Sequence, residues 1–274
     1  MADRLFSIVV LNWNRLHYTK QTIDNILKLT KVPHILTLVD NNSDESTGVR
    51  EYLSSITKSN TNATEVLHVF NSKNLGVAGG RNSGIHEVEQ RGLAPKYLFN
   101  VDDDVLLPTD YDVRLIEACD RIPSLGITGV NVEPYNYPLV QINGATVQHK
   151  QQGNLGGAAL CLPRRVFNVV GYYGFGSGTL YSHEDSYMRR KMDVLGLSSC
   201  YIQPRGIHLD TDSDLAYRAE KNKAHVKGSL QLQELSKAVK RLLETKDVYT
   251  PYVSPETYQP VDETLFTNEL MRKK

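Results

Sequence analysis

The chain has 274 residues, 40% of them hydrophobic, and its 31 basic and 31 acidic side chains give a formal net charge of zero. This length is enough to bury a sizeable core, as one large α/β domain or as one domain with an appendage. The balanced charge excludes the global basic excess that drives nonspecific nucleic-acid binding, and it leaves a local basic patch open.

The three cysteines, Cys119, Cys161 and Cys200, are odd in number and far apart in the sequence. They form neither a metal-binding spacing nor a disulfide framework, which favours a reducing compartment and a role as small buried apolar residues. The apolar run near the N-terminus is too short for a signal peptide, and no stretch is long enough to span a bilayer. We therefore expect a soluble cytoplasmic protein, with peripheral membrane contact left open.

The first half of the chain alternates short apolar runs with segments of helical spacing. The apolar runs predict buried strands at residues 5–11, 35–39, 66–70 and 97–101. Helices are predicted between them at residues 18–29, 46–56 and from Gly80 or Arg81 to Gln90. This alternation indicates a parallel, doubly wound sheet, in which ligands bind outside the carboxyl ends of the strands.

Polar or glycine-rich segments follow all four predicted strands. They are NWNR at residues 12–15, DNNSD at 40–44, a glycine-rich segment at 71–85 and DDD at 102–104. The glycines let the backbone approach a ligand or a neighbouring element closely. We therefore expect the ligand site at this edge of the sheet.

The DDD segment consists of Asp102, Asp103 and Asp104. Three adjacent carboxylates repel one another, so a fold that gathers them at a strand end is expected to use them, and hard oxygen ligands suit Mg²⁺ or Mn²⁺. Alternate residues of an extended chain point the same way, so Asp102 and Asp104 are expected to converge while Asp103 faces elsewhere. An isolated DxD pattern is more often a solvated acidic turn, because short motifs match by chance.

The second half of the chain is less regular. Helices are predicted at residues 110–121, 164–170 and 183–195, and strands at 127–132, 139–142, 156–162 and 200–203. Residues 171–178 form a loop rich in glycine and aromatic residues, and residues 214–246 are mostly helical in pattern. The stripe of Leu232, Leu235, Val239 and Leu242 favours packing on its own domain over a dimeric coil, because the heptads are too few.

In their order, these segments resemble the GT-A-fold glycosyltransferases, in particular those of the family 2 type. The resemblance covers about residues 6–209, and it rests on SIVVLNWNR, LVDNNSDES, NLGVAGGRNSGI, FNVDDDVLLP, GGAALCLPRRVF, HEDSYMRRKMDVLG and the late His208. It implies a Rossmann-like α/β fold with a mostly parallel central sheet, helices on both faces and a C-terminal helical extension. The implied domains are a GT-A domain at residues 1–212, with a nucleotide-sugar half at 1–108 and an acceptor half at 109–212, and a helical extension with a proline-containing tail at 213–274.

The resemblance also implies a nucleotide-diphosphate-sugar donor. Asp40 matches the acid that binds the nucleotide in the family, although an acid at this position is also typical of a turn or a helix N-cap. The other residues that the resemblance assigns to the nucleotide are Asn12, Asn14, Asn42, Gly76, Gly80, Arg81, Asn82, Asp102 and Asp103. A purely architectural role for the glycines stays open.

A divalent metal, Mn²⁺ or Mg²⁺, is implied as well. Asp104 matches the direct metal ligand, and Asp102 matches a residue that binds the metal, a metal-bound water or the ribose. His208 matches a histidine that often completes the metal shell, and a structural role for it is equally open. The metal would neutralise charge on the departing nucleotide diphosphate, and Asp103 is expected to be the most dispensable of the three aspartates.

Asp185 matches the catalytic base of the inverting members of the family. It would take the proton from an acceptor hydroxyl as that oxygen attacks the anomeric carbon. The alternative is that Glu184 and Asp185 only begin a helix, where acids favour the macrodipole. Gly157, Tyr181 and Glu184 are the implied acceptor residues, and the family's frequent second acid is replaced here by Tyr187.

The predicted function is a metal-dependent, inverting glycosyltransferase of the hexosyltransferase type (EC 2.4). UDP-sugar is the default donor, with dTDP- and GDP-sugars behind it, and the acceptor is a glycan, a lipid-linked sugar, a protein or a modified nucleic-acid base. The alternatives are a sugar-phosphate nucleotidyltransferase, a retaining glycosyltransferase and a nucleotide-sugar-binding protein without turnover. The first of these ranks lower, because such enzymes carry a glycine-rich basic loop after the first strand and NWNR has no glycine. A homodimer through the C-terminal helix is left open as the less favoured alternative to packing on its own domain.

Overall fold

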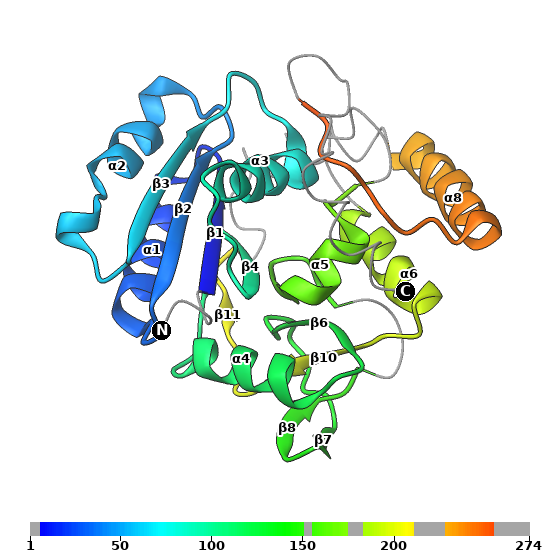
Figure 1. Ribbon diagram of the computed structural model, residues 1–274. Coiled ribbons are helices and arrows are strands. Elements are labelled where there is room, and N and C mark those ends of the chain that lie inside the picture. The colour runs from blue at the N-terminus through cyan, green and yellow to red at the C-terminus, as the bar shows by residue number, and fades with distance from the viewer. Residues whose placement is uncertain (1–5, 151–154, 175–182, 211–227, 255–274) are drawn as a thin grey trace.

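The computed structural model describes residues 6–150, 155–174, 183–210 and 228–254, with backbone only at 228–234 (Figure 1). The first half contains β1 (Phe6–Asn12), α1 (Leu16–Leu29), β2 (His34–Asp40), α2 (Val49–Ser55), β3 (Glu65–Phe70), α3 (Gly76–Gln90), β4 (Tyr97–Asp102) and β5 (Val105–Leu106). The second half contains α4 (Tyr111–Arg121), β6 (Leu125–Val130), β7 (Leu139–Ile142), β8 (Ala145–Gln148), β9 (Ala159–Pro163), α5 (Arg164–Val170), α6 (Glu184–Val194), β10 (Ser198–Ile202), β11 (Ile207–His208) and α8 (Gly228–Thr245).

Nine of these strands form one sheet in the order β3-β2-β1-β4-β9-β6-β10-β8-β7. The first four strands are parallel, which confirms the parallel arrangement expected from the sequence for the first half. Beyond β4 the sheet is mixed, because β9 runs antiparallel to both of its neighbours, and β8 and β7 are antiparallel as well. Since β9 pairs with both β4 and β6, the two halves of the chain share a single sheet.

Helices cover both faces of the sheet, as Figure 1 shows. In β1, Phe6, Ile8 and Val10 pack in one core cluster with residues of α1, α2 and α4. The intervening Val9 and Leu11 pack in a second cluster with residues of α3, α5 and α6. A strand that is buried on both faces favours apolar side chains at successive positions, which explains the unbroken run from Ile8 to Leu11 in β1.

Helix α3 begins at Gly76, four residues before the earliest start expected from the sequence. Glycine is a poor helix former, but here it allows α3 to approach the sheet. A Cβ at Gly80 would lie 2.4 Å from Leu11 Cδ1, and one at Gly84 would lie 2.4 Å from Val9 Cγ1. This close packing fixes Arg81, the residue after Gly80, against the carboxyl ends of the strands.

The C-terminal part of the described chain packs back on the domain. Leu242 of α8 is buried, and Leu235 and Val239 pack on the same core cluster as α6, which agrees with packing of the stripe on its own domain. Residues 246–254, called the C-terminal strap below, then follow. Thr250 accepts from Tyr172 N (2.9 Å) and donates to Val170 O (3.0 Å), so the strap is bonded to the segment after α5. In the described ranges no helix is long and apolar enough to cross a membrane.

Candidate active site

A pocket of about 520 Å³ opens at the carboxyl ends of β1, β2 and β4, within the size range of small-molecule sites. It brings together nine of the residues singled out in the sequence, namely Gly76, Arg81, Asp102, Asp103, Asp104, Gly157, Glu184, Asp185 and His208. They come from both halves of the chain, so the shared sheet assembles the site.

Arg81 forms one wall of this pocket and is only 1% exposed. Its Nη2 donates to Asp102 Oδ1 (2.6 Å) and Gly157 O (2.9 Å), and its Nη1 donates to Glu184 Oε1 (3.1 Å). The guanidinium also lies over the Tyr173 ring. Although burial opposes the charge on Arg81, Asp102 and Glu184 outweigh it and raise the pKa of the guanidinium.

Gly157 is placed where a side chain would be crowded. A Cβ there would lie 3.2 Å from Glu184 Oε1 and 3.4 Å from Arg81 Nη1. Glycine therefore eases the approach of this backbone segment to the arginine, and the Gly157 carbonyl is one of the three groups that accept from Arg81. Asp102, Glu184 and Gly157 are thus joined through one cation.

The three aspartates do not continue the extended geometry expected from the sequence. The strand ends at Asp102, and Asp103 and Asp104 form a turn, so the alternation of side chains stops there. Asp102 points to Arg81, whereas Asp103 and Asp104 both pair with Arg15. The expected divergence of Asp102 and Asp103 is present, but Asp104 lies with Asp103 at one guanidinium.

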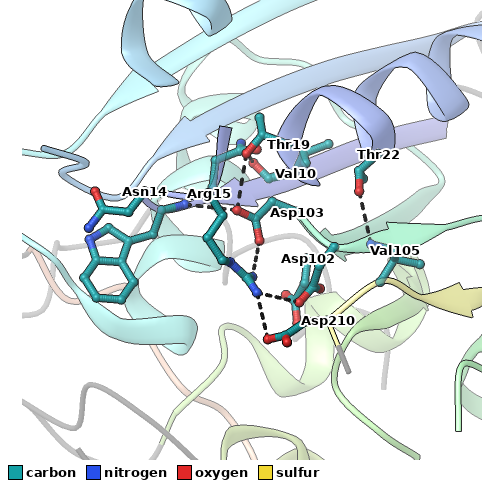
Figure 2. Close-up of polar contacts among 12 residues, drawn as sticks. Val10, Asn14, Arg15, Thr19, Thr22, Asp102, Asp103, Val105 and Asp210 are labelled. Carbon is teal, nitrogen blue, oxygen red and sulfur yellow. Dashed lines mark hydrogen bonds and ion pairs between the residues drawn. The ribbon is translucent and has the colours of Figure 1, made fainter. Parts of the chain in front are cut away.

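Asp103 was expected to be the most dispensable aspartate, yet it is only 2% exposed and well bonded. It accepts from Arg15 Nη2 (2.5 Å), from the Trp13 main-chain N–H (3.3 Å) and from Thr19 Oγ1 (3.3 Å). Figure 2 shows Asp103 between Arg15 and Thr19. These bonds tie the turn after β4 to the loop after β1, so Asp103 holds the floor of the pocket together.

Asp104 and His208 lie side by side. Arg15 Nη1 donates to Asp104 Oδ2 at 2.8 Å, and His208 Nε2 lies 3.4 Å from the same oxygen. The short pairing of β5 with β11 places His208 opposite Val105, and Leu209 N donates to Asp104 O at 2.7 Å. Backbone bonds therefore hold the histidine next to the aspartate.

The protonation of this group follows from its surroundings. Although burial opposes ionisation of Asp104, the hydrogen bond from His208 and the charge of Arg15 lower its pKa. Burial raises the pKa of Asp103 to about 7 against the opposing effect of Arg15. The hydrogen bond to Asp104 raises the pKa of His208. Burial thus favours the protonated form of Asp103, whereas Asp104 stays ionised.

The residues present fit a divalent cation in their chemistry. Asp104 Oδ1 is buried and has no hydrogen-bond partner among the described residues. Asp102 and His208 add a carboxylate and an imidazole at the same pocket, a donor set that suits Mn²⁺ or Mg²⁺. Within the described residues, no group of three metal-binding side chains is already arranged as a metal site. Asp104 is instead turned toward Arg15 and His208.

Asp185 lies in the first turn of α6, after His183, whose φ of 73° marks the left-handed start of that helix. Its Oδ1 accepts from the main-chain N–H of Ser186 at 2.6 Å. Asp185 is half-buried and lines the pocket, whereas its neighbour Glu184 is buried against Arg81. The first turn of α6 thus supplies both a structural carboxylate and an accessible one.

Asp40 does not line the pocket. It is fully buried, its Oδ1 accepts from Ser43 N (2.9 Å), and its Oδ2 accepts from Arg50 Nε (2.8 Å). The turn role that the sequence left open is therefore the one these contacts describe. Asn12 is also buried, with its amide on Val10 O and Val39 O (both 3.0 Å).

The other residues expected near the nucleotide have structural contacts outside the pocket lining. Asn14 bonds with Asp44, Asn42 is exposed in a left-handed turn, and the two amide atoms of Asn82 bond the backbone of Tyr173. Gly80 packs on Leu11, as described above. Tyr181 lies outside the described residues.

The sequence reasoning missed seven polar or aromatic residues that line the pocket, namely Trp13, Arg15, Asn41, Asn74, His183, Ser186 and Asp210. His183 and Ser186 flank the two predicted acids at the start of α6. Trp13, Arg15 and Asn41 lie in the polar clusters that follow predicted strands, and this position was the available signal. Asn74 precedes the glycines of α3. Asp210 comes two residues after His208, and no local pattern marked it.

The amide of Asn74 has a fixed orientation. Asn41 Oδ1 accepts from Leu75 N (3.1 Å), so Asn41 Nδ2 faces the other way and donates to Gly76 O (3.1 Å) and Asn74 Oδ1 (2.9 Å). Gly76 N donates to the same Asn74 oxygen at 2.8 Å. No described residue accepts from Asn74 Nδ2, so this pocket residue offers a hydrogen-bond donor.

Comparisons with solved structures show the same fold. The mannosyltransferase PcManGT from Pyrobaculum calidifontis, in complex with GDP-Man and Mn²⁺, has a TM-score of 0.56 at 16% identity over 86% of this chain and 64% of its own. GalNAc-T7 with UDP, GalNAc and Mn²⁺ has a TM-score of 0.54 at 14% identity over 75% of this chain. TarS from S. aureus has a TM-score of 0.52 at 13% identity over 88% of this chain.

This chain spans 43% of the length of GalNAc-T7 and of TarS, so it represents part of the architecture of those proteins. No curated protein matches its sequence. Residues 7–172 match the family model described as glycosyl transferase family 2, and this match ends before α6 and β11. The fold is therefore that of the GT-A glycosyltransferases, and the chain, more than half of which matches the model, belongs to glycosyl transferase family 2.

Proposed function

We propose that this protein is a metal-dependent glycosyltransferase that moves a sugar from a UDP-sugar to an acceptor hydroxyl with inversion. The observation that carries the proposal is that Asp102, Asp104, His208 and Asp185 line one pocket at the carboxyl ends of the parallel strands. Metal-type donors and a candidate base thus lie around a space of small-molecule size.

The charge of the pocket supports a metal with an anionic donor. Six carboxylates line it, and the described lining contains two arginines, both paired with carboxylates. A nucleotide diphosphate would meet net repulsion there, because like charges in a partly buried site repel strongly. PcManGT and GalNAc-T7 each bind Mn²⁺ with their nucleotide ligand, which agrees with a divalent ion that resolves this repulsion.

Asp104, Asp102 and His208 would hold this ion. When bound, it would act as a Lewis acid that stabilises the negative charge on the nucleotide diphosphate as it leaves. The protein's own part is to orient these donors. Arg15 and the β5–β11 pairing hold Asp104 and His208 together, and Arg81 holds Asp102.

Asp185 would act as the general base on the acceptor side. In an inverting displacement the acceptor oxygen attacks the anomeric carbon, the bond to the diphosphate breaks, and the acceptor proton moves to the base. Glu184 serves less well, because its carboxylate is buried and paired with Arg81. Asp185 is half-buried in the same pocket, where an acceptor hydroxyl can reach it.

The fixed amide of Asn74 supports a carbonyl-bearing base in the donor. Asn41 and Asn74 follow β2 and β3, while the metal-type donors follow β4, two and three strands away in the sheet. A nucleotide whose diphosphate lies at β4 would therefore extend its base toward the asparagines. A free N–H donor that meets the 4-position of a pyrimidine favours the carbonyl of uracil or thymine over the amino group of cytosine, whose own carbonyl is at C2.

The nucleotidyltransferase alternative is disfavoured by the contacts of the basic residue after β1. A loop that holds a triphosphate needs an available cation, and Arg15 is bonded to three carboxylates. The structure offers no comparable observation in favour of the retaining or the non-catalytic alternative.

The proposal is tested by UDP binding to the full chain, measured by calorimetry with and without Mn²⁺. We expect Mn²⁺ to tighten UDP binding. In Asp104→Asn we expect the affinity for UDP in Mn²⁺ to fall by about 100-fold, the upper end of effects seen for metal-site residues. Asp110→Asn is the matched control, because Asp110 pairs with Lys31 at the surface. Unchanged Mn²⁺-dependent affinity in Asp104→Asn would contradict the metal assignment.

A further inference from the structure

Arg15 is the cation around which the deepest carboxylates of the pocket gather. It follows β1 and is 7% exposed. Its Nη1 donates to Asp104 Oδ2 (2.8 Å) and to Asp210 Oδ2 (3.1 Å), and its Nη2 donates to Asp103 Oδ1 (2.5 Å). Figure 2 shows the guanidinium reaching toward Asp103 on one side and Asp210 on the other.

Among the residues that the structure describes, this pairing is unequal in charge, because three carboxyl groups meet one guanidinium. A buried carboxylate needs a compensating charge or several hydrogen bonds, since removal from water is costly. Asp103 has additional donors in Trp13 N and Thr19 Oγ1. Asp104 depends on Arg15 and His208, and its Oδ1 has no described partner.

The geometry assigns different roles to the two oxygens of Asp104. Oδ2 is held by Arg15 and lies next to His208, and this contact fixes the rotation of the carboxylate. Oδ1 is thereby left as the oxygen that can face a bound cation. Arg15 thus orients a metal ligand without donating any electron pair to the metal itself.

Residues near Arg15 in the sequence also hold it in place. Asp103 is anchored to the main chain at Trp13, and the guanidinium lies 5.5 Å from the centroid of the Tyr18 ring. An arginine remains charged at any relevant pH, so its charge stays at the site whether or not a second cation is present. A divalent ion at Asp104 therefore binds against this fixed positive charge.

We propose that Arg15 is a positioning residue that serves as the built-in counter-ion of the metal ligands. It stabilises the carboxylate cluster of the metal-free protein and weakens Mn²⁺ binding to that state. The two negative phosphates of the donor then offset the repulsion between Arg15 and the ion, so that metal and donor bind cooperatively. This inference rests on the proposed role of Asp104 as a metal ligand.

The test measures the binding of Mn²⁺ to the metal-free full chain without nucleotide. The electron paramagnetic resonance signal of free Mn²⁺ serves as the readout. We expect Arg15→Gln to bind Mn²⁺ about tenfold more tightly than the wild type, because a neighbouring unit charge changes cation affinity by at least this factor. We also expect UDP to enhance Mn²⁺ binding less in this variant. A purely structural role for Arg15 predicts equal or weaker Mn²⁺ binding, and that result would overturn the inference.

Two further variants keep the test decisive if Arg15→Gln does not fold. At a pH above the Asp103 pKa of about 7, Asp103→Asn removes one carboxylate and leaves Arg15 in place, so Mn²⁺ should bind about tenfold more weakly. Arg15→Gln with Asp103→Asn removes one charge of each sign, and its Mn²⁺ affinity should return to within about threefold of the wild type. Tight binding that persists in the double variant, or an unchanged affinity in Asp103→Asn, would exclude a charge effect.

The outcomes separate this inference from the proposed function. If the wild type fails to bind Mn²⁺ even with UDP, the metal-dependent function itself is wrong. If the wild type binds Mn²⁺ with UDP and Arg15→Gln binds Mn²⁺ no more tightly, only the role of Arg15 is wrong.

Discussion

The two arginines of the pocket make an instructive pair. Arg81 meets two carboxylates, Asp102 and Glu184, together with a backbone carbonyl. Arg15 meets three carboxylates, of which Asp210 lies 195 positions away in the chain. Each arginine joins part of the DDD segment to a residue from the second half of the chain. Arg81 binds Asp102, and Arg15 binds Asp103 and Asp104.

The difference between them lies in what each leaves unsatisfied. The carboxylates at Arg81 connect the end of β4 with the start of α6, so this arginine ties the donor side to the acceptor side. The carboxylates at Arg15 outnumber its charge, and one oxygen of Asp104 has no described partner. Both arginines meet more carboxylates than one charge balances, but a buried carboxylate oxygen without a described partner lies at Arg15 and not at Arg81, so the Arg15 cluster is the one suited to accept a further cation.

The largest expected effect is a loss of sugar transfer without a loss of UDP binding. We expect Asp185→Asn to lower the rate of sugar transfer by about 10²–10⁴-fold, because the base that takes the acceptor proton is lost. UDP binding in Mn²⁺ should stay unchanged, since Asp185 belongs to the acceptor side. Asp193→Asn, which alters an acid paired with Arg189 on the same helix, is the control for both assays. Transfer within tenfold of the wild type would reject Asp185 as the base.

The second effect separates the two arginines by stability. We expect Arg81→Ala to lower the free energy of unfolding by about 3–5 kcal/mol, because the buried carboxylate of Glu184 and the partly buried one of Asp102 lose their partner. Added Mn²⁺ should restore little of this loss, whereas it should restore much of the loss in Arg15→Gln. Denaturant unfolding with and without Mn²⁺ measures both changes.

Arg91→Ala is the control for this comparison, since Arg91 is an exposed arginine at the end of α3 that pairs with Glu87. It should change the free energy of unfolding little. Equal recovery of both buried-arginine variants in Mn²⁺ would remove the distinction between a structural and a cation-accepting cluster.

The smallest effect concerns the donor side away from both arginines. Asn74→Asp keeps the oxygen that accepts from Asn41 and Gly76 and replaces the free N–H₂ group by an acceptor oxygen. We expect the preference for UDP over CDP to fall by about tenfold, the effect of one hydrogen bond of roughly 1.4 kcal/mol. The added charge acts on both nucleotides alike, so the ratio of their dissociation constants isolates the base. An unchanged ratio would place the base elsewhere.

The sequence predicts the donor half of the fold well, because its signals are local. The strand predicted at residues 5–11 is Phe6–Asn12 in the structure, and that at 35–39 is His34–Asp40. The direction of β9 (Ala159–Pro163) could not be predicted, since it depends on pairing with strands far away in the chain. The early start of α3 was missed because glycine propensity is overridden by contacts with β1.

The sequence predicts where the site lies, but it does not predict which side chains pair with one another there. The position of Asp102 at a strand end marks the pocket, and Asp185 at a helix start marks its other side. The partner of Asp104 is 89 positions away in the chain, and only the sheet brings it close. Likewise, the sequence assigns Asp40 to the nucleotide because a strand-end acid is visible, whereas its pairing with Arg50 depends on how α2 packs.

The bonding of the C-terminal strap to the segment after α5 has a consequence for synthesis on the ribosome. The four parallel strands that carry the donor side are complete once Asp102 has been made. Tyr172 N and Val170 O receive their partners only when Thr250 emerges, on the order of 10 s later at ordinary translation rates. The nascent chain thus completes these four parallel strands well before the segment after α5 receives its final backbone bonds.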